Sequence, residues 1–356
     1  MVPVTAQFQA ESALHPAARE LLLEIFDQGW ADPRKLHLES RRAAILLQEA
    51  KESIANDLGL SPAEIYFLGE ISLGFHLAVA GLAHNEGRLI HSSIDRQEVL
   101  ALAGQFPHAL HVGVNNSGEI SLPRLARSDV LLWQSINAET GLHRPLHAEL
   151  HEFSGSIFVD HTAYPMPAPE LPSWTTALWD ASSWSGPHGL SIFGLKSGTQ
   201  SWRNPFPHLE QSVVPSGFSL PLAMASAVAL SHWKKDEIAA TSNASEMAQR
   251  IRDYVSVEIP HTDFLSADLP ALRSILSLSF LYVDAERLQA DLAAEGFAVD
   301  SGSACISANL EASHVLKGMG LLSQGNIRLR LHHRVTIAEI EAFLPVLKRL
   351  VEKQRE

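Results

Sequence analysis

The only cysteine in the 356 residues is Cys305, which lies in a run of mostly small residues from Asp300 to Glu311. The run reads Asp-Ser-Gly-Ser-Ala-Cys-Ile-Ser-Ala-Asn-Leu-Glu. Because few large side chains surround the thiol in sequence, the segment is predicted to be a loop that a substrate or partner can approach. A thiolate at this point could act as a nucleophile. The alternative is an unpaired cysteine that packs as a small apolar side chain.

The segment around Cys305 resembles the active-site loop of the cysteine desulfurases, pyridoxal phosphate (PLP) enzymes of the class V aminotransferase group. That family carries Ser-Ser-Gly-Ser-Ala-Cys, then Leu-Glu, a helix and an Ile-Arg strand. Here Ser301 to Cys305, Leu310-Glu311, a helix at Ala312 to Gly318 and Ile327-Arg328 follow in the same order. The resemblance implies that Cys305 holds sulfur as a persulfide and that Arg328 pairs with a substrate carboxylate. The alternative for Arg328 is a solvated strand arginine.

A second match concerns a carboxylate at the end of an apolar strand, Ser156 to Asp160. The resemblance places Asp160 against the pyridine nitrogen of PLP, which it would keep protonated so that the ring accepts electrons. Asn137, within Ser135 to Gly141, matches one of two family asparagines. The alternative for Asp160 is a turn or helix cap at the strand end.

The turn Gly69-Glu70-Ile71-Ser72-Leu73 matches the family's phosphate-binding turn, Gly-Ala-Thr-Glu-Ser. A helix start favours an anion, and Ser72 could supply a hydroxyl. However, Glu70 adds a negative charge there, so a strand, turn and helix without a ligand remain an open alternative. Arg96 stands where the family has a histidine that stacks on the cofactor ring. A guanidinium can stack on an aromatic face but does not shuttle protons near neutral pH.

The family's Schiff-base lysine belongs in the segment Ala177 to Gly189, three residues before a Gly-Pro pair. Counting back from Gly186-Pro187 places Ser183 at the lysine and Ser182 at the preceding histidine. A hydroxyl cannot form a Schiff base, so ordinary PLP turnover is not expected. PLP, if bound, is expected to be non-covalent, with no covalent internal aldimine, held by these candidates: Asp160, Asn137, Ser72, Arg96, Ser182 and Ser183.

Composition and charge exclude several classes of function. The chain has 40 acidic and 27 basic residues and a net charge of −13, so nucleic acid is not an expected partner. One cysteine excludes a disulfide framework, and the 18 histidines show no metal-ligand spacing, so no metal is expected. Met1 to Ala10 has no leader pattern, and no apolar run reaches the roughly 18 residues of a membrane span. A cytoplasmic protein without membrane contact is therefore predicted.

Hydrophobic periodicity predicts the elements that position these residues. Amphipathic helices are expected at Pro16–Phe26 and Glu39–Leu58, and further helices at Leu220–Trp233 and Glu237–Val257. After Pro270 the pattern is typical of a small α/β unit, with strands expected at 275–280, 297–300 and 327–331 and helices at 285–296 and 337–352. His332, His333 and Arg334 form a short basic cluster, interpreted as a surface or entrance feature.

The resemblance implies the α/β fold of fold-type I PLP-dependent transferases. We expect a large doubly wound, mainly parallel sheet domain over residues 17–233, and a small C-terminal α/β domain from residues 1–16 and 234–356. By resemblance alone, the protein is expected to be a homodimer.

Three functional hypotheses follow. The first is a cysteine desulfurase-like protein, degenerate in PLP catalysis, in which Cys305 relays sulfur or regulates an active relative. Its partner would be a sulfur acceptor or that relative. The second is a PLP-dependent lyase or transferase that holds the cofactor non-covalently. The third is a non-catalytic binding scaffold.

Overall fold

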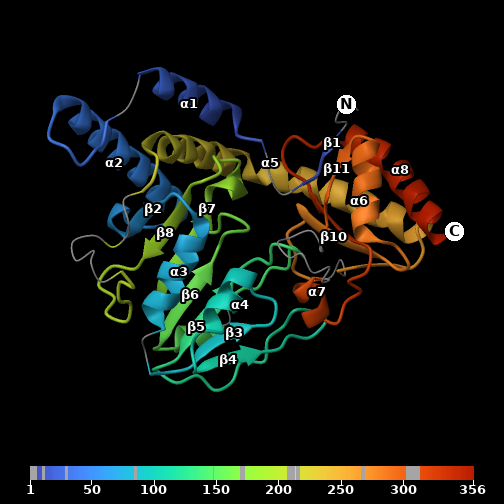
Figure 1. Ribbon diagram of the computed structural model, residues 1–356, viewed down its shortest axis with the longest axis horizontal. Helices are drawn as coiled ribbons and strands as arrows, with labels where there is room; N and C mark the ends of the chain where they lie inside the picture. The colour runs from blue at the N-terminus through green and yellow to red at the C-terminus, as the bar shows by residue number, and fades with distance from the viewer. Residues whose placement is uncertain are drawn as a thin grey trace.

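The computed structural model describes residues 6–9, 13–28, 31–83, 86–146, 148–168, 173–206, 213, 217–265, 269–301 and 313–356. Cys305 and the Leu310-Glu311 pair lie outside the described residues. Within the described ranges, no helix combines the length and apolar character that a membrane span requires. Figure 1 shows a larger part on the left and a smaller part on the right, with α5 (Leu220–Glu258) running across both.

A seven-stranded sheet forms the centre of the larger part, in the order β2-β8-β7-β6-β5-β3-β4. The strands from β3 to β7 run parallel, whereas β8 is antiparallel to both of its neighbours. The strands are β2 (Ile65–Leu68), β3 (Leu89–Ser92), β4 (Ala109–Val112), β5 (Val130–Gln134), β6 (Ser156–Asp160), β7 (Trp174–Asp180) and β8 (Ser191–Leu195).

Helices cover both faces of this sheet. The helices α3 (Ile71–Leu82) and α4 (Gln97–Ala103) pack on one face, and α2 (Leu38–Leu58) and the first half of α5 pack on the other. Successive strand residues point to opposite faces, so Leu132 packs with the α3 cluster and Trp133 with the α5 cluster. A further helix, α1 (Pro16–Gln28), contacts α5. The predicted fold class, a doubly wound and mainly parallel α/β sheet, is confirmed.

The smaller part is built on a four-stranded antiparallel sheet, β12-β13-β10-β9. Its core includes the second half of α5 and the N-terminal residue Phe8. The short strand β1 pairs in parallel with β11, which joins the N-terminus to this part. The elements are β1 (Ala6–Gln7), β9 (Thr262–Phe264), β10 (Ile275–Phe280), α6 (Ala285–Ala294), β11 (Phe297–Ala298), β12 (Asp300–Ser301), α7 (His314–Gly318), β13 (Asn326–Arg330) and α8 (Ile337–Arg355).

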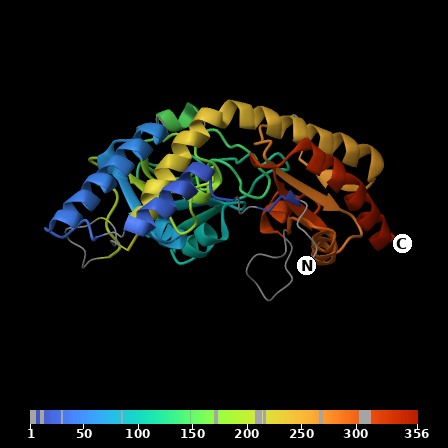
Figure 2. The same cartoon turned by 90° about the horizontal axis from the view of Figure 1, so that it is seen from above.

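One expectation about helices was wrong, because α5 is a single helix of 39 residues and not two. No glycine or proline separates the two predicted segments, so nothing interrupts the backbone hydrogen bonds there. Figure 2 shows the helix spanning both parts of the molecule. The boundary expected at residues 233 and 234 falls inside it. Ala223 to Leu230 pack on the larger core and Ala244 to Val255 on the smaller one, and the two-domain division stays a prediction.

Candidate functional site

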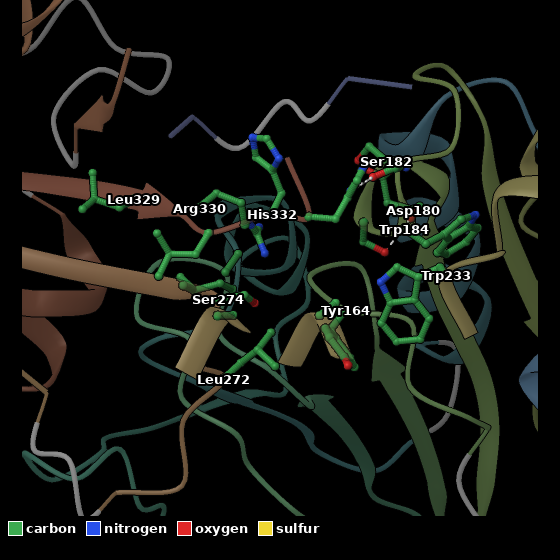
Figure 3. A pocket seen from close by; sticks show the side chains of 18 of the residues that line it. Tyr164, Asp180, Ser182, Trp184, Trp233, Leu272, Ser274, Leu329, Arg330 and His332 are labelled. Atoms are coloured by element: carbon green, nitrogen blue, oxygen red, sulfur yellow. Dashed lines mark hydrogen bonds between the residues drawn. The ribbon is translucent and has the colours of Figure 1, made fainter. Parts of the chain in front are cut away.

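A cavity of about 600 Å³ lies where the two parts meet. It is lined from the larger part by β7 and the turn after it, and from the smaller part by β13 and the residues that follow. Figure 3 shows this convergence, with Asp180, Ser182 and Trp233 on one side and Leu272, Ser274 and Leu329 on the other. Cavities of this volume bind small organic ligands in many proteins.

The carboxylate of Asp160 is buried at the end of β6, with 3% of its surface exposed. Its Oδ1 accepts hydrogen bonds from the Thr162 backbone N–H, at 2.9 Å, and from the Thr162 hydroxyl, at 2.6 Å. Its Oδ2 lies 3.5 Å from Nε of Arg96, and no described residue donates a hydrogen bond to it. Arg96 lines the cavity. The structure therefore places the protein's own cation beside Asp160.

Ser182 and Ser183 lie in η3 (Ala181–Trp184), the short 3₁₀ turn after β7, and both line the cavity. The Ser183 hydroxyl donates to the Asp180 carbonyl oxygen at 2.8 Å, and the Ser182 backbone N–H donates to the Asp180 carboxylate at 2.9 Å. These bonds stabilise the turn, since a side chain that accepts or donates at a turn end satisfies backbone groups. The two serines and Arg96 line the same cavity, and their assignment to a cofactor stays a prediction.

None of the eight lysines lines this cavity, and all eight lie in the described part of the chain. Lys196, the first lysine after Ser183 in sequence, follows β8 and places its Nζ 5.6 Å from the centre of the Trp174 ring. An amine that could form a Schiff base in the cavity is therefore absent from the lining residues.

Ser72 does not reach the cavity. It lies exposed in the first turn of α3, whose N-cap is Glu70. The Glu70 carboxylate accepts a hydrogen bond from the Leu73 backbone N–H at 3.0 Å. Although burial disfavours its charge, hydrogen bonds from the Ser72 and Leu73 backbone and from the Ser72 hydroxyl hold the pKa of Glu70 below its usual value. The anion position at this helix start is filled by the protein itself.

Asn137 is also kept from the cavity by its own hydrogen bonds. Its Oδ1 accepts from the Glu139 backbone N–H and from the backbone N–H and hydroxyl of Thr140. Its Nδ2 donates to the carbonyl oxygen of Ile94 and to Oε1 of Gln134, both at 2.9 Å. The side chain is 1% exposed. In this structure Asn137 stabilises the turn after β5.

Arg328 lines the cavity from β13. Its Nη2 donates to the Ser301 carbonyl oxygen at 3.1 Å, and its Nη1 lies 3.8 Å from Oε2 of Glu139. Ser301 marks the end of the described chain before the cysteine segment, and Cys305 itself lies outside the described residues. The contact with Ser301 places Arg328 beside the start of that segment.

Several cavity residues were not predicted, above all Arg330 and Tyr164. The Arg-x-Arg spacing in a predicted strand could have revealed Arg330, because alternate strand residues share a face.

The histidines His332 and His333, interpreted as an entrance feature, line the cavity. Burial, followed by the charges of His332 and Arg334, lowers the pKa of His333 to about 4. Among the described residues, no group of three or more histidine, cysteine or acidic side chains could hold a metal ion.

His161, which follows Asp160, is predicted to make stability sensitive to acid. Burial, with a smaller effect of His143, lowers the pKa of His161 to about 3. Below about pH 6.5 the imidazole of His161 binds a proton in the unfolded chain but not in the folded chain. The free energy of unfolding therefore decreases as pH falls from about 6.5 toward 3. We expect a loss of about 1.4 kcal/mol per pH unit near pH 5 from this group. Urea unfolding at pH 7 and pH 5 measures it.

His161→Phe is the variant for this test, because it retains a ring against Trp179, on which the imidazole stacks at 5.2 Å. The difference in unfolding free energy between the two pH values should shrink in this variant. The exposed residue His151 offers a control in His151→Phe, which should keep the wild-type difference. An unchanged difference in His161→Phe would contradict the prediction.

Comparison with known proteins shows similarity over the whole chain. No family model matches. The mitochondrial cysteine desulfurase of Drosophila melanogaster is 24% identical over 99% of this chain and 82% of its own length. Cysteine desulfurase IscS of Rickettsia akari (strain Hartford) is 23% identical, over 100% of this chain and 92% of its own length.

Solved structures show the same fold. A NifS-like protein superposes with a TM-score of 0.85 at 18% identity, covering 98% of this chain and 99% of the other. The apo structure of the cysteine desulfurase from Thermococcus onnurineus NA1 gives a TM-score of 0.80 at 16% identity, covering 98% and 94%. The likeness therefore includes both the larger and the smaller part.

Proposed function

We propose that this chain, a homologue of the cysteine desulfurases with their fold, uses Cys305 to receive and pass on sulfur and does not run PLP catalysis of its own. This would make it a degenerate member of the group, or pseudoenzyme. Its proposed partners are a second copy of the chain, as a homodimer, and either a sulfur-acceptor protein or an active desulfurase. A cytoplasmic location is part of the same proposal.

The observation that carries this proposal is that Arg96, a side chain of the protein itself, lies beside the Asp160 carboxylate. The Nε atom of Arg96 lies 3.5 Å from Oδ2 of Asp160. A protonated pyridine nitrogen that paired with this oxygen would have to displace Arg96. A phosphate at the start of α3 would meet the Glu70 carboxylate, which already accepts from the Leu73 N–H. Two like charges at one helix start repel each other.

Covalent binding of PLP also requires an amine, and the residue that lines the cavity at the expected lysine position is Ser183. The residues present do not fit covalently bound PLP, so no step of the proposed function passes through it. The sulfur transfer needs only the thiol. A Cys305 thiolate attacks the outer sulfur of a donor persulfide, the donor S–S bond breaks, and the donor leaves as a thiolate. One sulfur atom moves without any added oxidant or reductant.

A second candidate is a lyase or transferase that holds PLP without a covalent bond. It is favoured by one observation, the buried Asp160 Oδ2 that receives no hydrogen bond from a described residue. Absorption spectra of the chain with PLP, before and after borohydride, separate the candidates. The first predicts that an added amino acid changes the spectrum no more than it changes that of free PLP. The second predicts a saturable band that the amino acid shifts and that borohydride does not fix to a single lysine.

We expect the native chain to take up one sulfur atom at Cys305 from a persulfide donor, such as an active cysteine desulfurase with cysteine. Intact-mass analysis detects the added sulfur. Because the chain has one cysteine, Cys305→Ser removes every thiol and should abolish the uptake entirely. An activated thiol should react about 10-fold faster in the native chain than in the same chain in urea with a small persulfide donor.

Two results would count against this function. Equal rates in the native and urea-unfolded chain would show an ordinary exposed thiol, and a slower rate in the native chain would show a buried one, as in the scaffold hypothesis. Absence of sulfur uptake by the native chain would do the same. A chain that accepts sulfur should also release it as sulfide when a dithiol is added.

A further inference from the structure

Arg330 lines the cavity with a positive charge, and no carboxylate from the described part of the chain forms an ion pair with it. The residue is the last of β13 and lines the cavity. Its Nη1 donates to the Ala163 carbonyl oxygen at 3.5 Å, which is the limit of a hydrogen bond. No carboxylate of a described residue lies within 4 Å of its guanidinium, whereas Arg96 and Arg328 each have one at that distance or closer. Arg330 is half-buried, and a charge partly removed from water is costly unless a counter-ion pairs with it.

The charges around Arg330 do not provide that counter-ion. Burial, followed by the charge of Arg96, lowers the pKa of Arg330 to about 10, so the side chain stays charged at neutral pH. Arg328 acts in the same direction. Asp300 and Asp180 act in the opposite direction, but neither approaches within ion-pair distance.

The neighbours on the same strand add further donors. Arg328 and Arg330 are two residues apart in β13, so their side chains leave the same face of the sheet. Ser301, across the sheet on β12, lines the cavity and is 1% exposed. Its hydroxyl has no hydrogen-bond partner among the described residues. A buried hydroxyl of this kind is normally satisfied by a partner, such as a water or a ligand.

Aromatic side chains form another section of the cavity wall. Tyr164 and Trp233 pack edge to face, with ring centres 4.9 Å apart, and both line the cavity. The Tyr164 hydroxyl donates to Glu237 at 3.0 Å, which fixes the ring. Figure 3 shows both rings with Arg330 in the same cavity. This wall offers flat apolar surface to a ligand.

We propose that the cavity binds a small organic anion, with its anionic group on Arg330 and its apolar or aromatic body against Tyr164 and Trp233. The charge of the ligand would complete the ion pair that Arg330 lacks, and a guanidinium binds carboxylate or phosphate with two parallel hydrogen bonds. This inference goes beyond the proposed function, because it concerns a ligand and holds whether or not Cys305 carries sulfur.

The test measures binding to the full chain by calorimetry and thermal unfolding, with benzoate, phenyl phosphate, inorganic phosphate and benzylamine as probes. We expect saturable binding of benzoate or phenyl phosphate and none of benzylamine, which has the same ring and the opposite charge. Phenyl phosphate tighter than benzoate would identify phosphate esters as the source of the anion, and the reverse order would identify carboxylates. Inorganic phosphate should bind more weakly than phenyl phosphate, because it lacks the ring.

Arg330→Gln should weaken binding of the better probe by at least about 10-fold. Without ligand, this variant should be as stable as the wild type or more stable, because an incompletely paired, half-buried charge is removed. Arg330→Lys keeps the charge and should retain part of the affinity. Arg287→Gln is the matched control, since Arg287 is an exposed arginine on α6, and it should bind like the wild type.

Three outcomes would overturn the inference. Benzylamine could bind as tightly as benzoate, or Arg330→Gln could keep the wild-type affinity. Arg330→Gln could also unfold at a lower temperature while Arg330→Lys binds no anion, which would show a purely structural role. The comparison of benzoate with benzylamine needs no variant, so it decides the question even if Arg330→Gln fails to fold.

Discussion

Ser183→Lys is expected to give the chain a PLP adduct that borohydride fixes to one lysine, whereas the wild-type chain should give none at a unique site. The reason is local, because Ser183 lines the cavity near Asp180 and has a hydroxyl at the position where the family resemblance places the lysine amine. Lysine supplies the amine that a Schiff base requires. Peptide mass analysis after reduction locates the adduct.

The neighbouring serine provides the matched control. Ser182→Lys adds the same amine one step along a 3₁₀ turn, which rotates the side chain by about 120°. Its yield of adduct should be much lower. Adding Glu70→Ala to Ser183→Lys removes the carboxylate from the start of α3 and should raise the affinity for PLP about 10-fold or more. Equal labelling of both lysine variants, or a unique adduct in the wild type, would refute the assignment of Ser183.

Most of the fold could be predicted because the hydrophobic patterns are strong. The expected strand at Ser156–Asp160 matches β6, and the expected helix from Ile337 matches the start of α8. The strand β7 was missed, because all its residues before Asp180 are buried and its sequence, Trp-Thr-Thr-Ala-Leu-Trp, does not alternate. The gap expected within α5, between Trp233 and Glu237, was wrong, because lysine and aspartate at 234–236 are compatible with a helix interior.

The candidate site was less predictable, because side-chain direction depends on tertiary packing. The family resemblance assigned Asn137 and Ser72 to a cofactor. In the structure Asn137 bonds to Thr140, and the Ser72 hydroxyl bonds to the Glu70 carboxylate, and motif matching does not reveal these contacts. The ion pair of Arg96 with Asp160 joins residues far apart in the chain, and no periodicity reveals it. The cysteine segment lies outside the described residues, so the role of Cys305 stays a prediction.

Arg96→Leu should destabilise the chain by about 2 kcal/mol, because it leaves the Asp160 carboxylate buried without its cation. Removing one partner of a fully buried pair costs about 3–5 kcal/mol. Arg96 is 28% exposed and Asp160 is 3% exposed, so solvent screens part of that cost. Urea or thermal unfolding measures the loss.

A double-mutant cycle isolates the interaction between the two side chains. Asp160→Asn removes the charge and keeps an oxygen for the Thr162 donors, so the double variant should lose much less than the sum of the single losses. We expect a coupling of about 1–3 kcal/mol. The control cycle uses the exposed pair Arg250 and Glu341, at 2.8 Å, where the coupling should stay below about 1 kcal/mol.

The same variant tests whether Arg96 takes the place of a cofactor's positive charge. If the guanidinium substitutes for a protonated pyridine nitrogen, then PLP should stabilise Arg96→Leu more than it stabilises the wild type, since Asp160 gains a cation only in the variant. The double variant Arg96→Leu/Asp160→Asn should not show this additional stabilisation by PLP. Equal effects of PLP on all three chains, together with a coupling as small as that of Arg250 and Glu341, would mean that the pair is incidental.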